Sequence, residues 1–184
     1  VVDGVNGQPL MRDMAVEDLL GRQSVPIDVE ACRKLIAGKV TLVTGAAGSI
    51  GSELCRQILR FQPRLLLMVD NNETGIFELT SELSSRAKNP PIKGVVGSIL
   101  QKNKMESLFR QYQPEIVFHC AAYKHVPLME ETPEEAVWVN LQGARLIANL
   151  ALKYGVGRFV FISSDKAVEP NGVMGATKRV GELL

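Results

Sequence analysis

Three glycines stand between a β-branched run and a segment of helical periodicity. They are Gly45, Gly48 and Gly51 in the sequence T-G-A-A-G-S-I-G (44–51). At such a junction, the first glycine permits a tight turn, the second lets the backbone approach a pyrophosphate, and the third lets the helix pack closely on the strand. The N–H groups at the helix start, Ser49 and Ile50, would then receive phosphate oxygens. The pattern predicts a dinucleotide site, and its alternative is a purely structural strand-to-helix turn.

An acidic residue closes the next apolar run, LLLMVD, at Asp70. A carboxylate there can accept hydrogen bonds from the hydroxyls of an adenosine ribose. A turn or cap role is compatible with this, because 71–73 (N-N-E) suit a helix start. No Lys or Arg occurs between Asp70 and Arg86 to neutralise a 2′-phosphate, which favours NAD over NADP. Ser98 stands where an Asp often meets adenine in such folds.

A second set of residues follows a later apolar run, in HCAAYKHVPLMEE (119–131). In open α/β sheets, ligands bind outside the carboxyl ends of the strands. Ala121 and Ala122 are small enough to let the backbone approach a cofactor. Lys124 and His125 are candidates for substrate binding, although a solvated charge and an exposed loop histidine would look the same.

A hydroxyl, a carboxylate and an amine stand side by side at Ser164, Asp165 and Lys166, after the last apolar run. A proton acceptor and a proton donor at this position are what an elimination reaction requires. An ion pair on a surface loop is the alternative.

Lys178 follows on the next expected helix. Many short-chain dehydrogenases carry a tyrosine base four residues before such a lysine, but here that position is Met174. Alone, Met174 indicates core packing. With Lys178 it indicates that another group replaces the usual base.

Five apolar runs alternate with helical patterns and must position these residues. Strands are expected at 39–44, 64–69, 92–96, 115–120 and 158–163, and helices at 49–61, 73–86, 102–112, 133–154 and from about Gly175. The first helix places Ile50, Leu54, Ile58 and Phe61 on one stripe, and Trp138 is among the apolar residues of the long one. Strands apolar throughout are covered on both faces. The prediction is an α/β fold, a doubly wound, Rossmann-like parallel sheet.

The composition of the chain excludes several classes of protein. The 184 residues are 46% hydrophobic and 22% charged, with a formal charge of +1, which does not suit a nucleic-acid binder. Apolar runs are too short to span a bilayer, and the three scattered cysteines form no metal or disulfide pattern. Residues 1–38 are expected to be a linker with short helices near 14–20 and 29–37. The nucleotide-binding domain is expected at 39–184, truncated before a substrate domain.

The motifs VTGAAGSIGSEL, FHCAAYKHVPLME and SSDKAVEPNGVMGATKR together resemble the polysaccharide-biosynthesis branch of the extended short-chain dehydrogenases. The resemblance covers about 19–184 and points to the UDP-N-acetylglucosamine 4,6-dehydratases, especially their large membrane-attached subgroup. It implies a longer protein of surface polysaccharide or capsule synthesis, held at the cytoplasmic face of the inner membrane. This chain would be its NAD-binding core, a fragment of a hydro-lyase that contacts no membrane and is catalytically inactive by itself. A homo-oligomer is possible.

The resemblance also assigns roles. NAD takes a hydride from carbon 4 of the UDP-sugar, Lys166 removes the carbon-5 proton, Asp165 protonates the departing carbon-6 hydroxyl, and the hydride returns to carbon 6. Ser164 would orient the carbon-4 hydroxyl or relay its proton, and Lys178 would hold the nicotinamide ribose. The base for the carbon-4 hydroxyl is left open.

Two alternatives stand beside this hypothesis. A nucleotide-sugar epimerase or ketoreductase normally keeps the tyrosine that Met174 replaces. A non-catalytic dinucleotide-binding regulatory module needs neither Asp165 nor Lys166.

Overall fold

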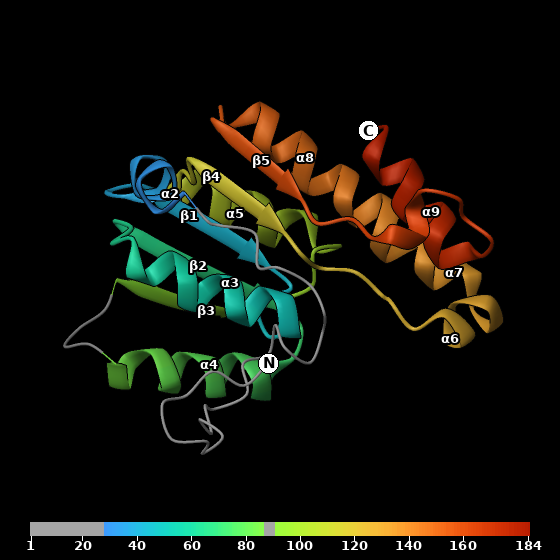
Figure 1. Ribbon diagram of the computed structural model, residues 1–184, viewed down its shortest axis with the longest axis horizontal. Coiled ribbons are helices and arrows are strands. Elements are labelled where there is room, and N and C mark those ends of the chain that lie inside the picture. The colour runs from blue at the N-terminus through green and yellow to red at the C-terminus, as the bar shows by residue number, and fades with distance from the viewer. Residues whose placement is uncertain (1–27, 87–90) are drawn as a thin grey trace, which may run out of the picture. The chain divides into compact units, whose positions relative to one another are not determined.

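Five parallel strands form one sheet in the order β3-β2-β1-β4-β5 (Figure 1). The computed structural model describes residues 28–86 and 91–184, so the helix expected near 14–20 lies outside the described residues. The strands are β1 (Val40–Thr44), β2 (Leu65–Asp70), β3 (Ile92–Val96), β4 (Ile116–His119) and β5 (Arg158–Phe161). The order reverses between β1 and β4, which confirms the predicted doubly wound sheet.

The register brings the expected site segments to one edge of the sheet. Thr44, the last residue of β1, pairs with Val69 on one side and with His119 on the other. The segments that follow β1, β2 and β4 therefore leave the sheet side by side. Every residue of β1 is buried, as expected for a central strand with helices on both faces.

Helices cover the two faces of the sheet (Figure 1). One core contains residues of α2 (Val29–Ile36), α3 (Ser49–Arg60) and α4 (Glu73–Arg86). The other contains residues of α5 (Lys102–Tyr112) and α8 (Ala144–Lys153). β1 supplies both cores, since Val43 faces the first and Leu42 the second. The sheet is therefore the middle layer, and a layer of helices packs on each of its two faces.

The expected helix over 133–154 is present as continuous helical backbone over 133–153, but the sequence pattern did not predict that part of it is π-helical. The structure has α7 (Pro133–Ala136), then a π-helical segment η1 (Val137–Gly143), then α8. The π segment contains a buried asparagine, Asn140, whose side chain bonds to neighbouring segments. Such bulges in helices often accompany functional sites.

Two short helices were not predicted. The helix α6 (Val126–Glu131) begins with a proline in its first turn, and the 3-10 helix η2 (Asp165–Ala167) is capped by the Ser164 side chain. The last helix, α9 (Val173–Glu182), starts close to its expected position. Within the ranges that the structure describes, no helix has the length and apolarity needed to cross a membrane.

Two of the apolar residues named in the expected helices are exposed. Ile50 and Trp138 are each 57% exposed. Ile50 belongs to the first turn of α3, at the carboxyl edge of the sheet, where it lines a pocket instead of packing inside. In α3 the core positions are Cys55 and Ile58.

Candidate functional site

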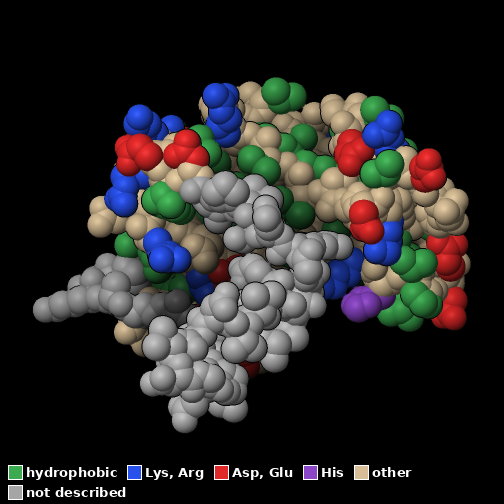
Figure 2. Space-filling view, in the orientation of Figure 1, with side chains coloured by type: hydrophobic (Ala, Val, Ile, Leu, Met, Phe, Trp, Pro, Cys, Tyr) green, Lys and Arg blue, Asp and Glu red, His purple; other side chains and the backbone are tan. Residues whose placement is uncertain are grey.

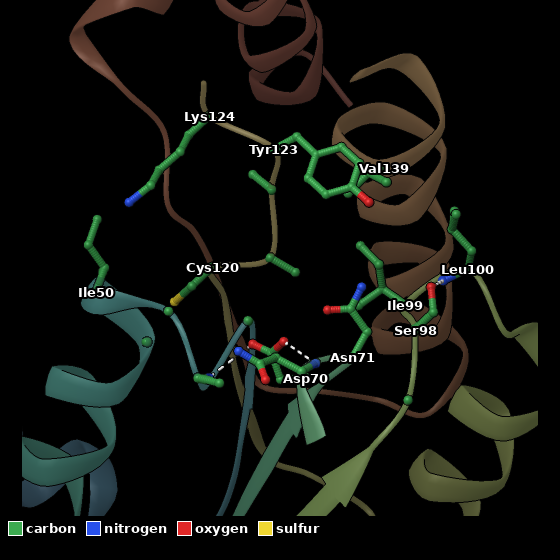
Figure 3. Close-up of a pocket in the computed structure, with 18 of the residues that line it drawn as sticks. Ile50, Asp70, Asn71, Ser98, Ile99, Leu100, Cys120, Tyr123, Lys124 and Val139 are labelled. Carbon is green, nitrogen blue, oxygen red and sulfur yellow. Dashed lines mark hydrogen bonds between the residues drawn. The ribbon is translucent and has the colours of Figure 1, made fainter. Parts of the chain in front are cut away.

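A pocket of about 400 Å³ opens at the carboxyl ends of the strands (Figure 3). Its walls come from the glycine turn after β1, the residues after β2 and β3, the loop after β4, and one side of α7 and η1. Most of the predicted cofactor residues line it: Gly45, Gly48, Ser49, Ile50, Gly51, Asp70, Ser98, Ala121 and Ala122. In Figure 3, Tyr123 and Lys124 extend toward it from one side and Asp70 from the other.

The glycine turn is shaped by close backbone contacts. Gly45 has a φ of +67°, and a Cβ there would lie 2.5 Å from the backbone N of Ala121. A Cβ on Gly51 would lie 2.0 Å from the Gly45 oxygen. Gly48 is the N-cap of α3 and supplies no side-chain cap. Because the first turn of a helix leaves its N–H groups without intrahelical acceptors, the turn offers free donors to an anion.

Asp70 ties the end of β2 to this turn. Its Oδ2 accepts a hydrogen bond from the Ala47 N–H at 2.9 Å, and its Oδ1 accepts from the Asn72 N–H at 3.0 Å. The cap of α4 is Asn72, whose Oδ1 accepts from the Gly75 N–H. Each carboxylate oxygen has a second lone pair. Asp70 therefore has a turn role and keeps acceptor capacity at the pocket.

The pocket continues over the residues after β3. The Ser98 Oγ accepts a hydrogen bond from the Leu100 N–H at 3.2 Å, and its own N–H donates to Gln101. Ser98, Ile99 and Leu100 line the pocket together. This end thus offers apolar side chains and one hydroxyl.

Asn140 fixes the loop after β4, and the sequence reasoning missed it. Its Oδ1 accepts from the Tyr123 N–H at 2.7 Å, and its Nδ2 donates to the Tyr123 carbonyl at 2.9 Å and to the Thr177 Oγ1 at 3.1 Å. Asn140 is 1% exposed. The side chain joins η1, the pocket loop and α9. A polar residue within an apolar helical stretch was the available signal.

The two candidate substrate residues lie differently. The amine of Lys124 extends toward the pocket in Figure 3. His125 is exposed and is the N-cap of α6, and it is not among the lining residues described for the pocket. Figure 2 shows charged side chains of both signs and a histidine gathered over the region of α6, α7 and α9.

Ser164, Asp165 and Lys166 form one hydrogen-bonded group at η2. The Ser164 Oγ donates to Asp165 Oδ1 at 3.0 Å and accepts from the Lys166 N–H at 3.2 Å, while Lys166 Nζ lies 3.4 Å from the same Asp165 oxygen. The hydrogen bond from Ser164, and then the charge of Lys166, lower the pKa of Asp165. The three follow β5, and none of them is among the pocket's described lining residues.

Lys178 and Met174 are buried, at 5% and 4% exposure. The Lys178 amine donates to the Ile162 carbonyl and lies 4.1 Å from the centre of the Phe161 ring. Burial lowers the pKa of Lys178 to about 8. Met174 packs in a small apolar cluster with Met129 and Ala136, so this position supplies no group that titrates.

Burial keeps the nearby thiols neutral. It raises the pKa of Cys120, which lines the pocket, to about 11, and that of Cys55 to about 12. A thiolate nucleophile is therefore not favoured here. In the described part of the chain, no three His, Cys, Asp or Glu side chains gather as a metal ion would require.

His119 is a buried, neutral histidine beneath the site. Its Nδ1 lies 2.8 Å from the Thr44 Oγ1, and its Nε2 has no hydrogen-bond partner among the described residues. The ring stacks with Phe161 at 5.8 Å and with Phe159 at 6.1 Å. Burial, with a smaller effect of Lys178, lowers the pKa of His119 to about 3.

The pKa of His119 predicts acid sensitivity of the fold. Between its unfolded pKa, near 6.5, and about 3, only the unfolded chain binds this proton, so the free energy of unfolding falls as pH falls through this window. The expected contribution is small at pH 7 and approaches about 1.4 kcal/mol per pH unit near pH 5, where the unfolded histidine is fully protonated. Urea unfolding from pH 7 to 5 should show this slope in the parent and a shallower one in His119→Asn. His125→Asn, at an exposed position, is the matched control; equal slopes in all three proteins would contradict the assignment.

The order of the strands, the glycine turn after β1 and the acid that ends β2 define the class of protein as a Rossmann-like α/β domain. The sequence comparison goes one step further. Residues 41–184 match the family described as polysaccharide biosynthesis protein, and the chain belongs to that family. The family resemblance predicted from the motifs is confirmed.

Individual relatives agree with this. The chain is 46% identical to the probable polysaccharide biosynthesis protein EpsC of Bacillus subtilis and 41% identical to the capsular polysaccharide biosynthesis protein CapD of Staphylococcus aureus, in each case over 95% of this chain and 29% of the relative. It is 30% identical to a UDP-N-acetylglucosamine 4,6-dehydratase (inverting) of Campylobacter jejuni, over 80% of this chain and 42% of that protein. The chain thus spans under half the length of these relatives.

Solved structures share the fold. The X-ray structure of Pen from Bacillus thuringiensis matches 80% of this chain and 46% of its own, with a TM-score of 0.74 and 32% identity. A UDP-glucose 4-epimerase of Thermotoga maritima, with UDP-glucose, matches 78% and 49%, with a TM-score of 0.68 and 28% identity. WbmG of Bordetella bronchiseptica, in complex with NAD, matches 80% and 49%, with a TM-score of 0.68 and 25% identity.

Proposed function

We propose that this chain is the NAD-binding core of a nucleotide-sugar 4,6-dehydratase acting on UDP-N-acetylglucosamine. The observation that carries the proposal is the pocket at the reversal of strand order, lined by the glycine turn and Asp70 and followed along the same sheet edge by the Ser164–Asp165–Lys166 group. The Campylobacter jejuni relative supports the reaction class, and WbmG supports the cofactor. The longer protein would belong to surface polysaccharide synthesis at the cytoplasmic face of the inner membrane.

The described residues fit a dinucleotide. Gly48, at the start of α3, puts no side chain between the helix N–H groups and the pocket. Asp70 retains acceptor capacity for ribose hydroxyls, and Ile99 and Leu100 offer an apolar surface for a base. Lys178 would meet the nicotinamide ribose. When bound, NAD supplies the acceptor, and later the donor, of a hydride.

The chain's own residues would handle the protons. Lys166 would take the proton from carbon 5, and Asp165 would deliver one to the leaving hydroxyl at carbon 6. The contacts of Asp165 with Ser164 and Lys166 favour its ionised form. The acid role therefore requires that the sugar exclude water from Asp165 and displace the Ser164 hydroxyl. Ser164 would then be free to bond the carbon-4 hydroxyl.

An epimerase or ketoreductase is the second candidate, favoured by the structural likeness to the Thermotoga maritima epimerase. The buried, untitratable Met174 argues against it, because those enzymes need a base that Met174 does not supply. The product distinguishes the two candidates: a dehydratase releases a 4-keto-6-deoxy sugar, whereas a 4-epimerase releases a sugar that keeps its hydroxyl groups and has the opposite configuration at carbon 4.

Calorimetric titration of NAD and NADP into the chain tests the cofactor assignment. Asp70→Ala should weaken NAD binding by about 1–3 kcal/mol, because hydrogen-bonding groups of the ribose and of the turn lose their acceptor. NADP should bind more weakly than NAD to the parent chain, since Asp70 would face the 2′-phosphate.

The matched control is Glu78→Ala, an exposed acid on α4 outside the pocket. It should bind NAD as the parent does. Parent-like NAD affinity in Asp70→Ala would contradict the role of Asp70. No binding of either nucleotide to the parent chain would contradict the cofactor assignment itself.

A further inference from the structure

Lys178 is a buried cation with neutral contacts. Its amine donates to the Ile162 carbonyl and lies 4.1 Å from the Phe161 ring centre. Within 28–86 and 91–184, no carboxylate forms an ion pair with it. A buried ammonium loses its hydration, and without a counter-ion other polar contacts must compensate for that loss. The groups that surround Lys178 show what replaces it.

The carboxylate whose charge acts on Lys178 is engaged by other groups. Glu182, one turn further along α9, raises the pKa of Lys178 through its charge, but its oxygens accept from the Ser163 Oγ at 2.5 Å and from Arg179 at 2.9 Å. Arg179 therefore compensates much of the charge of Glu182.

The titratable groups on the β4 side carry no charge at neutral pH. Burial raises the pKa of Cys120 to about 11 and lowers that of His119 to about 3. Neither supplies a negative charge to Lys178. The Ile162 carbonyl and the Phe161 ring are thus its immediate electrostatic partners.

The Phe161 ring is held in place on two sides. It stacks with His119 on the paired strand β4, with ring centres 5.8 Å apart and planes at 13°. It also packs on α9 at Gly181, where a Cβ would lie 2.7 Å from the ring Cζ. Because α9 also carries Lys178, the fold fixes both partners of the contact.

We propose that Phe161 is a positioning residue: its ring face holds the Lys178 ammonium at the carboxyl end of β5 and stabilises its charge. An ammonium over an aromatic face is attracted by the ring quadrupole, most strongly where water is excluded. The functional meaning rests on the proposed function, in which Lys178 meets the nicotinamide ribose. Held in this way, the amine keeps N–H donors available to ribose hydroxyls that an ion-paired carboxylate would otherwise occupy.

The test measures the pKa of Lys178 by NMR of lysine labelled with carbon-13, in the chain without nucleotide. Replacement of Phe161 by pentafluorophenylalanine keeps the ring's shape and removes its negative face. We expect the pKa of Lys178 to fall by about 0.5–1.5 pH units in this variant. Phe161→Leu should show a similar fall and Phe161→Tyr should restore the parent value. Lys178→Met identifies the signal.

Phe159→Leu is the matched control, because Phe159 also stacks with His119 but is not described in contact with Lys178. It should leave the pKa of Lys178 unchanged. An unchanged pKa with pentafluorophenylalanine at position 161, or an equal fall in Phe159→Leu, would overturn the proposal. NAD titration of the same proteins is read separately: parent chain that binds no NAD would refute the proposed function while the pKa still decides the role of Phe161.

Discussion

Lys166→Met is expected to reduce formation of the 4-keto-6-deoxy product from UDP-N-acetylglucosamine by about 10²–10⁴-fold, the usual contribution of a positioned proton-transfer group. The assay uses this chain joined to the sugar-binding region that the family resemblance implies. The side chain of Lys166 is 55% exposed. Its removal should therefore change the free energy of unfolding by no more than about 0.5 kcal/mol.

Deuterium exchange makes the test specific to Lys166. In deuterated water the parent enzyme should incorporate deuterium at carbon 5, and Lys166→Met should not, while NAD affinity stays as in the parent. Lys153→Met is the matched control, since Lys153, in the last turn of α8, is a similarly exposed lysine that pairs with Glu106 and has no role in the proposed reaction. Product formation and carbon-5 exchange at parent rates in Lys166→Met would show that another group is the base.

The sequence predicted the sheet and the residues that lie at its carboxyl edge well, because both depend on local patterns. Strands buried on both faces lack an exposed polar face, and every residue of β1 is buried. The glycine turn was predictable because a side chain at Gly45 or Gly51 would clash with nearby backbone atoms, so these positions require glycine. Asp70 was predictable from its place at the end of β2.

The remaining features depend on contacts between distant segments, which no local pattern contains. Helical periodicity placed Ile50 on the apolar stripe of its helix, but the first turn of α3 lies at the carboxyl edge of the sheet, where Ile50 lines the pocket and is exposed. The π-helical segment within the helix over 133–154 accompanies the bonds of Asn140 to Tyr123 and Thr177. The contact of Lys178 with Phe161 joins α9 to β5 and has no periodic signature.

Gly45→Ala is expected to lower the free energy of unfolding by about 4 kcal/mol or more, which few single substitutions do. Two penalties combine at this position. The φ of +67° is costly for alanine, and the new Cβ would lie 2.5–2.7 Å from backbone atoms of Cys120 and Ala121. The backbone of Cys120 and Ala121 follows a central strand of the sheet and cannot move away as a flexible side chain would. The loop that lines the pocket must shift instead.

Gly38→Ala separates the two penalties. Gly38 has nearly the same φ, +69°, but nothing lies within 4 Å of the Cβ position. Its cost should be that of the left-handed backbone alone, about 1–2 kcal/mol. Urea unfolding of both variants measures the difference, which is the energy of the close approach between the turn after β1 and the loop after β4. Equal costs would mean that the two segments are not in contact, and the pocket they enclose would then lose its defining wall.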